Sequence, residues 1–494
     1  MKSRSNKQRQ AAVPHAVLQA YRLQMAGDAV QAERLYLDVL ATYPHEFNSL
    51  HQLGLIRRER GDHDGALAYM EAAVRANRTS TEALSNRGLI LQELGRHREA
   101  IDSFNRAVVI DRSDVVAIFN RGISLLALDR LQEALASFDR VLALAPGHVE
   151  ALYNRGNVLR ELRRHDAALA SYREALVLRP DDAEVRVNEA LTRLRLGDLI
   201  EGFRGYEWRW KRPDVAALQR PFAQPLWLGQ VPLRDRTILL HAEQGFGDTI
   251  QFVRYAGLAA RQGAKVILEV QPALVALTAG LPGVSAVIGR GEPLPPFDLH
   301  CPLLSLPLAF ATDLATIPAA VPYLTAPSDR VTTWQGRLPR EKPLRIGIVW
   351  AGSASYRLDA ERSLSLGQLA PLWSDPDIQC VSIQREPRIA DAAILAAHPA
   401  LRHVGAELQD FADTAAVIAV LDVVVSIDTA VAHLAGALGK PVLIMLPFSP
   451  DFRWILDRDD SPWYPTARLI RQQRRGDWGS VVAQVRRELA SAAW

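Results

Sequence analysis

The sequence has very little cysteine and no long apolar run. Cys301 and Cys380 are the two cysteines among 494 residues. Neither belongs to a CxxC motif or a Cys/His cluster, which argues against a disulfide framework and against a structural zinc site. No run of about 18 apolar residues occurs, and no apolar segment follows the basic start MKSRSNKQRQ. We therefore expect a protein of the reducing cytoplasm without a secretion signal or a membrane span.

An excess of one charge is also lacking. The formal net charge is +3, although 23% of the residues are charged, and so small an excess does not indicate nucleic-acid binding. Hydrophobic residues make up 48% of the chain, which is ordinary for a soluble globular protein. A chain of this length is expected to form about three domains.

The first two hundred residues repeat with a step of 34 residues. An alanine is followed four residues later by an aromatic residue or methionine, in the pairs Ala32/Tyr36, Ala66/Met70, Ala100/Phe104, Ala134/Phe138 and Ala168/Tyr172. Glycine keeps the same step at Gly54, Gly88, Gly122 and Gly156. The pattern resembles the tetratricopeptide repeat, which has two antiparallel helices per unit and stacks into an α-solenoid. We predict five units over 13–182 and an array with a terminal cap over 13–212.

One repeat position carries asparagine, at Asn86, Asn120, Asn154 and Asn188, and Arg-Gly follows the first three. This series resembles the asparagine ladder of the O-linked N-acetylglucosamine transferases, which grips peptide backbone on the concave face of their repeats. An amide suits that task because it both donates and accepts hydrogen bonds. The resemblance implies that the four asparagines bind a protein or peptide acceptor. Solvated side chains or contacts between repeats are the alternative.

Apolar runs after residue 212 predict the strands of parallel sheets. They lie at 236–241, 264–270, 284–289 and 298–301, and then at 344–350, 421–427 and 441–446, with a further strand before Gln384. Nearly unbroken β-branched runs such as 423–427 suit strands that are covered on both faces. We predict two Rossmann-like domains, an acceptor-side domain over 213–342 and a donor-binding domain over 343–494. The closing helix is expected to cross back to the first of them.

The segment SIDTAVAHLAGALGKP lies between two of these strands. Asp428 and Thr429 stand where a strand ends and a helix begins, a place that favours anions and ligands in open α/β sheets. The residues alone are equally consistent with a plain helix cap and an interior His433. The segment is similar to the signature of glycosyltransferase family 9, the bacterial heptosyltransferases. That resemblance implies that Asp428, Thr429, Ala430 and His433 hold a nucleotide-sugar donor.

A glycine-bearing loop, GFGD, follows the first strand after residue 212. Gly245 and Gly247 with Glu269 have part of a dinucleotide-binding spacing, but Ile250 stands where the third glycine belongs. The loop looks instead like the Gly-Asp loop of family 9, in which the aspartate is the proposed general base. Carried over, that base is Asp248.

The proposed reaction requires such a group. An acceptor hydroxyl must lose its proton as it attacks an anomeric carbon, and a carboxylate within hydrogen-bond reach performs this step. Asp248 also suits a helix N-cap, and Glu243 is the substitute candidate for the base. Gly247 and Thr249, on either side of Asp248, are expected to contact the donor.

Two further loops are candidates for phosphate contacts. Gly352, Arg362 and Ser363 lie in or near the loop after the strand 344–350, where family 9 carries a basic residue and serine. Gln384 and Arg385 follow another strand end, a sensible place for a diphosphate cation. A surface pair of Arg385 with Glu386 is the alternative. Two departures from the family, Tyr356 for a frequent His and Ala360 for a frequent Arg, put donor or acceptor preference in doubt.

The sequence therefore predicts an α-solenoid of tetratricopeptide repeats followed by an α/β part with two Rossmann-like domains of the GT-B type. We expect a bacterial, inverting, metal-independent hexosyl- or heptosyltransferase-like enzyme with a protein acceptor, a nucleotide sugar as its substrate and no cofactor. The pair Asp457 and Asp459 forms a DxD, which binds metal in a different glycosyltransferase fold and is not expected to do so in this one. An inactive repeat scaffold for protein assembly, or an enzyme acting on a lipid-linked or surface glycan, are the alternatives.

Overall fold

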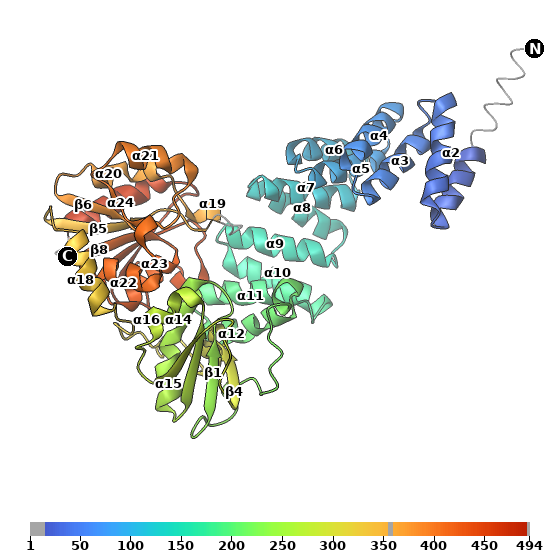
Figure 1. The fold of residues 1–494 in the computed structure, drawn as a ribbon. Helices are drawn as coiled ribbons and strands as arrows, with labels where there is room; N and C mark the ends of the chain where they lie inside the picture. The colour runs from blue at the N-terminus through green and yellow to red at the C-terminus, as the bar shows by residue number, and fades with distance from the viewer. Residues whose placement is uncertain (1–14, 354–358, 492–494) are drawn as a thin grey trace, which may run out of the picture. The chain divides into compact units, whose positions relative to one another are not determined.

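A computed structural model describes residues 15–353 and 359–491. The chain divides into two compact units with the boundary between Val185 and Arg186. The first unit is helical, and the second contains two parallel sheets with their helices (Figure 1). Both parts of the predicted fold class, the α-solenoid and the α/β part, are confirmed. Among the described residues, no helix has both the length and the apolarity that crossing a bilayer requires.

Helix pairs build the first unit, one pair for each repeat of the sequence. After a helical stretch over residues 15–25, they are α2 (Ala29–Thr42), α3 (Phe47–Glu59), α4 (His63–Ala76), α5 (Thr81–Glu93), α6 (His97–Ile110), α7 (Val115–Ala127), α8 (Leu131–Leu144), α9 (Val149–Glu161) and α10 (His165–Leu178). Helix α11 (Ala183–Arg195) continues past the boundary between the units. The repeated alanines and the residues four positions after them are all fully buried.

The repeated glycines have a packing cause. Gly88 lies under the ring of Phe104, and a Cβ atom at Gly88 would stand 2.5 Å from that ring. The same holds for Gly122 under Phe138, at 2.7 Å, and for Gly156 at 2.4 Å from the ring of Tyr172. A glycine in the first helix of a repeat therefore admits the aromatic ring of the second helix.

The arginines before these glycines also have a packing cause. The guanidinium of Arg87 donates to Ser103 Oγ at 2.6 Å and to Glu71 at 2.9 Å. The equivalent bonds run from Arg121 to Ser137, at 3.2 Å, and from Arg155 to Ser171, at 2.5 Å. Because these serines are fully buried, each arginine satisfies a hydroxyl that would otherwise lack a donor. The Arg-Gly pair thus ties the two helices of a repeat together.

The second unit contains two wholly parallel sheets. The first comprises β1 (Thr237–His241), β2 (Lys265–Val270), β3 (Val284–Gly289) and β4 (Leu299–Pro302), in the order β3-β2-β1-β4. The second comprises β5 (Leu344–Val349), β6 (Ile378–Ser382), β7 (Arg402–His403), β8 (Val423–Ile427), β9 (Val442–Leu446) and β10 (Ala467–Arg471), in the order β10-β9-β8-β5-β6-β7. The second order is that of the doubly wound dinucleotide-binding fold, and the first is its shorter form.

The second unit also contains helices of different lengths. They are α12 (Leu199–Tyr206), α13 (Pro213–Ala216), α14 (Phe246–Phe252), α15 (Ala256–Arg261), α16 (Val275–Thr278), α17 (Leu306–Ala309), α18 (Ser328–Arg337), α19 (Asp359–Arg362), α20 (Ala370–Trp373), α21 (Ala392–Ala397), α22 (Phe411–Val420), α23 (Ala430–Ala437) and α24 (Trp478–Ser491). Two 3-10 helices matter for the site, η1 (Glu207–Lys211) and η8 (Phe452–Trp454).

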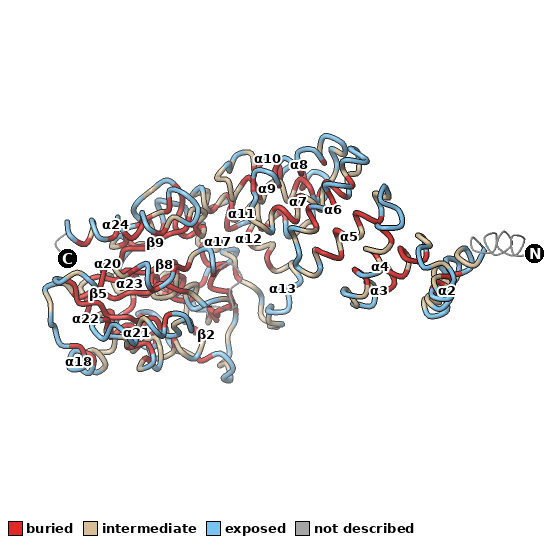
Figure 2. Tube along the Cα trace, turned by 90° about the horizontal axis from the view of Figure 1, so that it is seen from above, coloured by how far each residue is buried: buried red, intermediate tan, exposed pale blue. Residues whose placement is uncertain are grey.

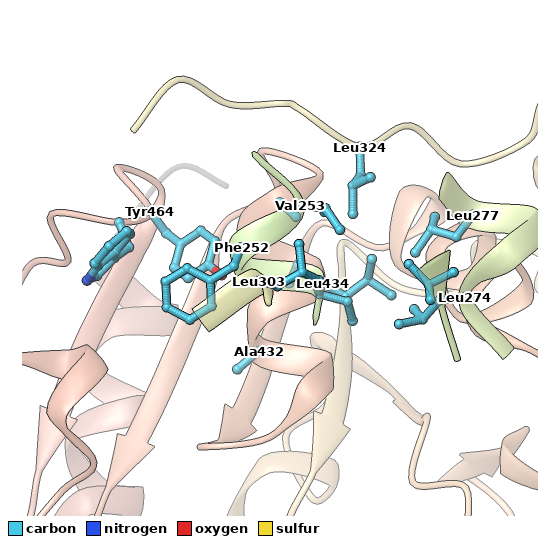
Figure 3. Packing of buried hydrophobic residues seen from close by; sticks show 14 of the residues in the cluster. Phe252, Val253, Leu274, Leu277, Leu303, Leu324, Ala432, Leu434 and Tyr464 are labelled. Carbon is cyan, nitrogen blue, oxygen red and sulfur yellow. The ribbon is translucent and has the colours of Figure 1, made fainter. Parts of the chain in front are cut away.

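One hydrophobic core joins the two sheets of the second unit. It includes Phe252 and Val253 at the end of α14, and Ala432 and Leu434 of α23. Figure 3 shows these side chains gathered with Leu303 and other apolar residues of the same cluster. In Figure 2, the buried residues concentrate on the strands and on the inward faces of the helices. The parts of the chain that follow β1 and β8 are therefore held together by apolar burial.

Two sequence-based expectations concern the ends of this unit. The closing helix does not cross back to the first sheet, because Trp478, Val481 and Val485 of α24 belong to the core cluster of the second sheet. The predicted terminal cap of the repeat array, which extends to residue 212, lies mostly beyond the boundary between the two compact units at residues 185 and 186. The reason is that Leu194, Phe203 and other residues of α11 and α12 pack in the core of the α/β part.

Replacing the glycine under an aromatic ring should destabilise the repeats. For Gly88→Ala we expect a loss of about 1–3 kcal/mol in the free energy of unfolding, because overpacking displaces Phe104. Urea denaturation of the full chain, followed by circular dichroism, measures the change. Gly147→Ala is the matched control, because a Cβ atom at that position meets nothing within 4 Å. Equal midpoints for the two variants would contradict this explanation of the repeat.

Candidate active site

The strand order of the second sheet reverses between β5 and β8. Open α/β sheets bind ligands at such a reversal, outside the carboxyl ends of the strands. Strand β8 leads there into Asp428 and Thr429, and Arg362 Nη1 donates to the carbonyl oxygen of Asp428 at 2.9 Å. The backbone N–H of Gly352, shortly after β5, donates to Ser363 Oγ at 3.1 Å. Five of the predicted donor-binding residues thus gather at one place.

Glycine is required at position 352. A Cβ atom there would stand 2.2 Å from Asp359 Oδ1 and 2.5 Å from Arg362 Nη2. Asp359 is buried, and its two oxygens accept from Arg362 Nε at 3.2 Å and from Arg388 Nη2 at 2.7 Å. The sequence analysis did not identify Asp359, which holds the guanidinium of Arg362 beside Asp428. The predicted departure at Tyr356 lies outside the described residues.

Gln384 and Arg385 differ in their surroundings. Gln384 is buried, and its Oε1 accepts from the backbone N–H groups of Trp350 and Ala351 at 3.3 and 3.1 Å. The side-chain amide of Gln384 therefore holds the segment that follows β5. If Gln384 Oε1 contacted a nucleotide-sugar donor, that contact would have to replace these two hydrogen bonds. Arg385 is exposed.

The Asp428 carboxylate is buried at the end of β8. Burial raises its pKa to about 6, and the negative charge of Asp451 adds to the rise, whereas the charges of Arg362 and Arg453 act in the opposite direction. Thr429 is the N-cap residue of α23, and its hydroxyl lies 3.0 Å from Ser426 Oγ. Within the described residues no side chain caps this helix, and Ala430 is its first residue.

His433 is an interior residue of α23. Its Nδ1 lies 2.9 Å from the hydroxyl of Tyr464, its Nε2 lies 3.8 Å from Asp428 Oδ1, and its ring stacks on Trp454 at 5.0 Å between centroids. Burial, together with the nearby charge of Arg453, lowers the pKa of His433 to about 3. The imidazole is therefore neutral at pH 7 and offers a hydrogen-bonding nitrogen rather than a charge.

The GFGD loop and the DTAVAH segment meet. Gly247 of α14 faces α23, where a Cβ atom on Gly247 would stand 3.0 Å from the ring of His433 and 3.6 Å from Ala430. Asp248 follows, and its Oδ2 accepts from the backbone N–H of Gly245 at 2.8 Å. Thr249 is buried and donates to Gln271 at 2.9 Å. Asp248 therefore has the capping contact that the alternative predicted, and it also stands beside the DTAVAH segment.

Arg453 links the two halves of the site, and the sequence analysis missed it. Its Nη1 donates to Asp451 at 2.7 Å, and its Nη2 forms a short ion pair with Asp248. Burial by itself would lower the pKa of Arg453, but the two carboxylates outweigh burial and raise it. The guanidinium is thus permanently charged. In the sequence, the feature that points to an ion pair of Arg453 is the aspartate two positions earlier. That aspartate does not reveal the second partner, Asp248 on α14.

Glu243 lies in a separate buried network. Its two oxygens accept from Arg209 Nη2 at 3.0 and 3.1 Å, and the same nitrogen donates to Ser305 Oγ at 2.8 Å. Burial raises the pKa of Glu243 to about 7, although Arg209 acts in the opposite direction. The carboxylate thus anchors η1 beneath the end of β1, and Asp248 is the carboxylate nearer to α23. Among the described residues no cluster of His, Cys, Asp and Glu has the arrangement of a metal site.

The asparagines of the repeats stand on α5, α7, α9 and α11. Asn86 Nδ2 lies 3.0 Å from Nε2 of the buried His51, so this amide joins two repeats. The amides of Asn120 and Asn154 each donate one hydrogen to a carbonyl of their own helix, at 2.9 and 2.8 Å, and are half-buried. One amide hydrogen and the side-chain oxygen remain for a ligand. Asn188 belongs to the second unit.

Comparison with known proteins gives two family matches. A tetratricopeptide repeat model matches residues 17–81, 51–115 and 119–183. The model of glycosyltransferase family 9 (heptosyltransferase) matches residues 388–454. Protein FlbA of Caulobacter vibrioides is 26% identical over 326 residues, which cover 60% of this chain and 53% of FlbA. The chain thus spans about half the length of this curated relative.

Solved structures resemble part of the chain. MamA is 23% identical, with 34% of this chain and 98% of that chain covered and a TM-score of 0.32. YrrB, described as a TPR protein with an unusual peptide-binding site, is 22% identical, with 37% and 94% covered and a TM-score of 0.34. The matches show that the chain contains tetratricopeptide repeats, which are followed by an α/β part. That part carries a glycosyltransferase family 9 segment, which contains Asp428, Thr429, Ala430, His433 and Arg453.

The buried carboxylate of Asp428 should give the protein a measurable pH dependence. Because the pKa of Asp428 is raised from 3.8 to about 6, the folded protein binds more protons than the unfolded chain between these values. This residue therefore lowers the free energy of unfolding as the pH rises from about 4 to about 6. We expect Asp428→Asn to melt at a higher temperature than the wild type at pH 7.5, by a margin that shrinks toward pH 4.

Thermal melts between pH 4 and pH 8 test this expectation. Asp459→Asn is the control, because Asp459 is exposed, and its melting temperature should follow that of the wild type throughout. A constant difference between Asp428→Asn and the wild type over the whole range would show that ionisation of Asp428 is not responsible.

Proposed function

We propose that the chain is a glycosyltransferase that moves a sugar from a nucleotide-sugar donor to an acceptor hydroxyl. The observation that carries the proposal is the meeting of α14 and α23, which brings Asp248 beside the reversal point of the second sheet with its Arg362, Asp428 and Thr429. The family 9 match over residues 388–454 supports it.

The reversal point has the chemistry that a nucleotide sugar requires. The first N–H groups of α23 and the guanidinium of Arg362 suit the negative charge of a diphosphate. The buried carboxylate of Asp428 and the neutral ring of His433 suit hydroxyl groups of the sugar or ribose. The proposed donor therefore lies with its diphosphate at the start of α23 and its anomeric carbon toward α14.

The proposed mechanism is a single displacement with inversion. Asp248 takes the proton of the acceptor hydroxyl while the acceptor oxygen forms its bond to the anomeric carbon. The bond from that carbon to the diphosphate oxygen breaks, and the nucleoside diphosphate leaves with the bonding electron pair. Arg362 and the start of α23 stabilise its charge, and on this proposal the reaction needs neither a metal ion nor a cofactor.

We propose a protein or peptide as the acceptor. Asn120 and Asn154 each keep one amide hydrogen and one oxygen that their own helix does not use, which suits a peptide group. Asn86 is committed to His51, so its part would be to hold the repeats in register. A lipid-linked or surface glycan remains the alternative acceptor, with the repeats docking a partner protein.

One observation favours a second candidate function, an inactive scaffold for protein assembly. Both oxygens of Asp248 are engaged, one by the N–H of Gly245 and the other by Arg453. An oxygen that already accepts from a guanidinium is less accessible to an acceptor hydroxyl. Ala360, where the family frequently has arginine, points in the same direction.

Nucleotide binding tests the proposed donor site. A thermal-shift screen of the full chain against nucleoside diphosphates and nucleotide sugars should give selective stabilisation, of about 2.7 kcal/mol at one hundred times the dissociation constant. Arg362→Gln should abolish most of the shift, because it removes a cation from the diphosphate. Arg468→Gln is the control, since Arg468 pairs with Glu488 at 2.6 Å on the exposed surface. If no nucleotide shifts the wild type, the scaffold replaces the enzyme.

The asparagines test the acceptor. The double variant Asn120→Ala/Asn154→Ala should transfer sugar to a protein acceptor about tenfold or more slowly, because two hydrogen bonds of about 1 kcal/mol each are lost. Its hydrolysis of the donor should equal that of the wild type in a nucleoside-diphosphate release assay. Asn105→Ala, on the exposed side of α6, is the control. Unchanged transfer by the double variant would favour a glycan acceptor.

A further inference from the structure

Arg453 touches both halves of the proposed site. It lies in η8, after the strand β9, and its side chain is about nine-tenths buried. Its partners are Asp451, near it in the chain, and Asp248, 205 positions away on α14. Its positive charge also acts on Asp428, where it and Arg362 oppose the rise in pKa that burial causes. Arg453 thus pairs with the proposed base, and its charge acts on Asp428, next to the proposed diphosphate position.

The ion pair conflicts with the proposed role of Asp248. As a base, Asp248 needs a free oxygen for the proton of the acceptor, but its Oδ1 accepts from Arg453 and its Oδ2 from Gly245. The bond to Gly245 is part of the first turn of α14 and positions the carboxylate. The bond to Arg453 lies on the other oxygen, so its loss would free Oδ1 for the acceptor hydroxyl.

This inference rests on the proposed function. We propose that the guanidinium of Arg453 pairs with Asp248 in the free protein and pairs with the diphosphate when the donor binds. Binding of the donor would thereby free Asp248 to act as the base. Arrival of the donor and release of Asp248 are then one event. The residue is not one of the predicted donor-binding residues, and the proposal adds it to Arg362 as a second cation for the diphosphate.

The chemistry of the guanidinium suits such an exchange. Arg453 keeps its place through Nη1 and Asp451, while Nη2 is the group that changes partner. Its Nε is buried and has no hydrogen-bond partner in the described part of the chain, so another acceptor would satisfy a donor that is otherwise unpaired. A diphosphate carries more negative charge than one carboxylate and accepts from a guanidinium in a bidentate manner. It therefore competes well for Arg453.

The exchange has a thermodynamic consequence that a simple phosphate contact lacks. If the diphosphate must first take Arg453 from Asp248, part of the binding free energy is used to break that ion pair. The coupling is reciprocal, so weakening the ion pair strengthens the binding of the diphosphate. Removing the charge of Asp248 should therefore tighten nucleotide binding even as it removes the base.

Isothermal titration calorimetry with the full chain tests the proposal. The probe is the nucleoside diphosphate that stabilises the wild type most, compared with its nucleoside monophosphate. We expect Asp248→Asn to bind the diphosphate about five- to tenfold more tightly and to lose sugar transfer, and Arg453→Gln to bind it at least tenfold more weakly. The double variant should bind like Arg453→Gln alone, because the gain from Asp248→Asn requires Arg453. The monophosphate should show much smaller changes.

The outcomes separate this inference from the proposed function. If the wild type binds no nucleotide, the proposed function fails and the exchange fails with it. If the wild type binds but Asp248→Asn binds equally or more weakly, Arg453 is only a structural ion pair, and the glycosyltransferase proposal stands. Asp214→Asn, which removes the carboxylate of an exposed pair with Arg212, is the control and should bind like the wild type. If Arg453→Gln fails to fold, Asp248→Asn, which keeps the side-chain shape, decides alone.

Discussion

The close approach of α14 to α23 is the constraint on which the site depends. Gly247 has no side chain, and the ring of His433 occupies the space that a Cβ atom would need. This approach brings a residue that follows β1 beside residues that follow β8, so that two sheets contribute to one site. Apolar burial supplies the force, through Phe252 and Leu434 in a shared core (Figure 3), and the glycine sets the distance.

Several charged side chains are buried where α14 meets α23, although protein interiors ordinarily exclude charge. Asp248, Asp428 and Asp451 gather around Arg453 and Arg362, and burying such groups costs free energy that their pairing only partly offsets. Asp428 shows the imbalance, since burial raises its pKa to about 6 despite two nearby arginines. Proteins keep such locally unfavourable clusters chiefly where function requires them. An additional anion would find its cations already in place.

Local pattern predicted most of the fold. The 34-residue step follows from the glycine and ring that meet in three of the repeats, as at Gly88 and Phe104, and β-branched runs such as 423–427 predicted the central strands. What the sequence did not reveal are pairings between distant segments, because periodicity carries no information about a partner 205 positions away, as between Asp248 and Arg453. The path of α24 was missed for the same reason. Asp248 and the DTAVAH segment were found through resemblance, whereas their contact required the structure.

The two sheets use their reversal points in different ways. In the first sheet, the chain that follows β1 carries Glu243, and Arg209 of η1 fills the position with a buried ion pair and a bond to Ser305. The ion pair anchors the segment that precedes the α/β part. Both carboxylate oxygens of Glu243 accept hydrogen bonds in it. In the second sheet, the equivalent position is lined by Gly352, by backbone groups and by Arg362. The two sheets therefore contribute different groups to the site. The second sheet has the groups that suit a phosphate. The first contributes a single carboxylate, Asp248, through the helix that packs against α23.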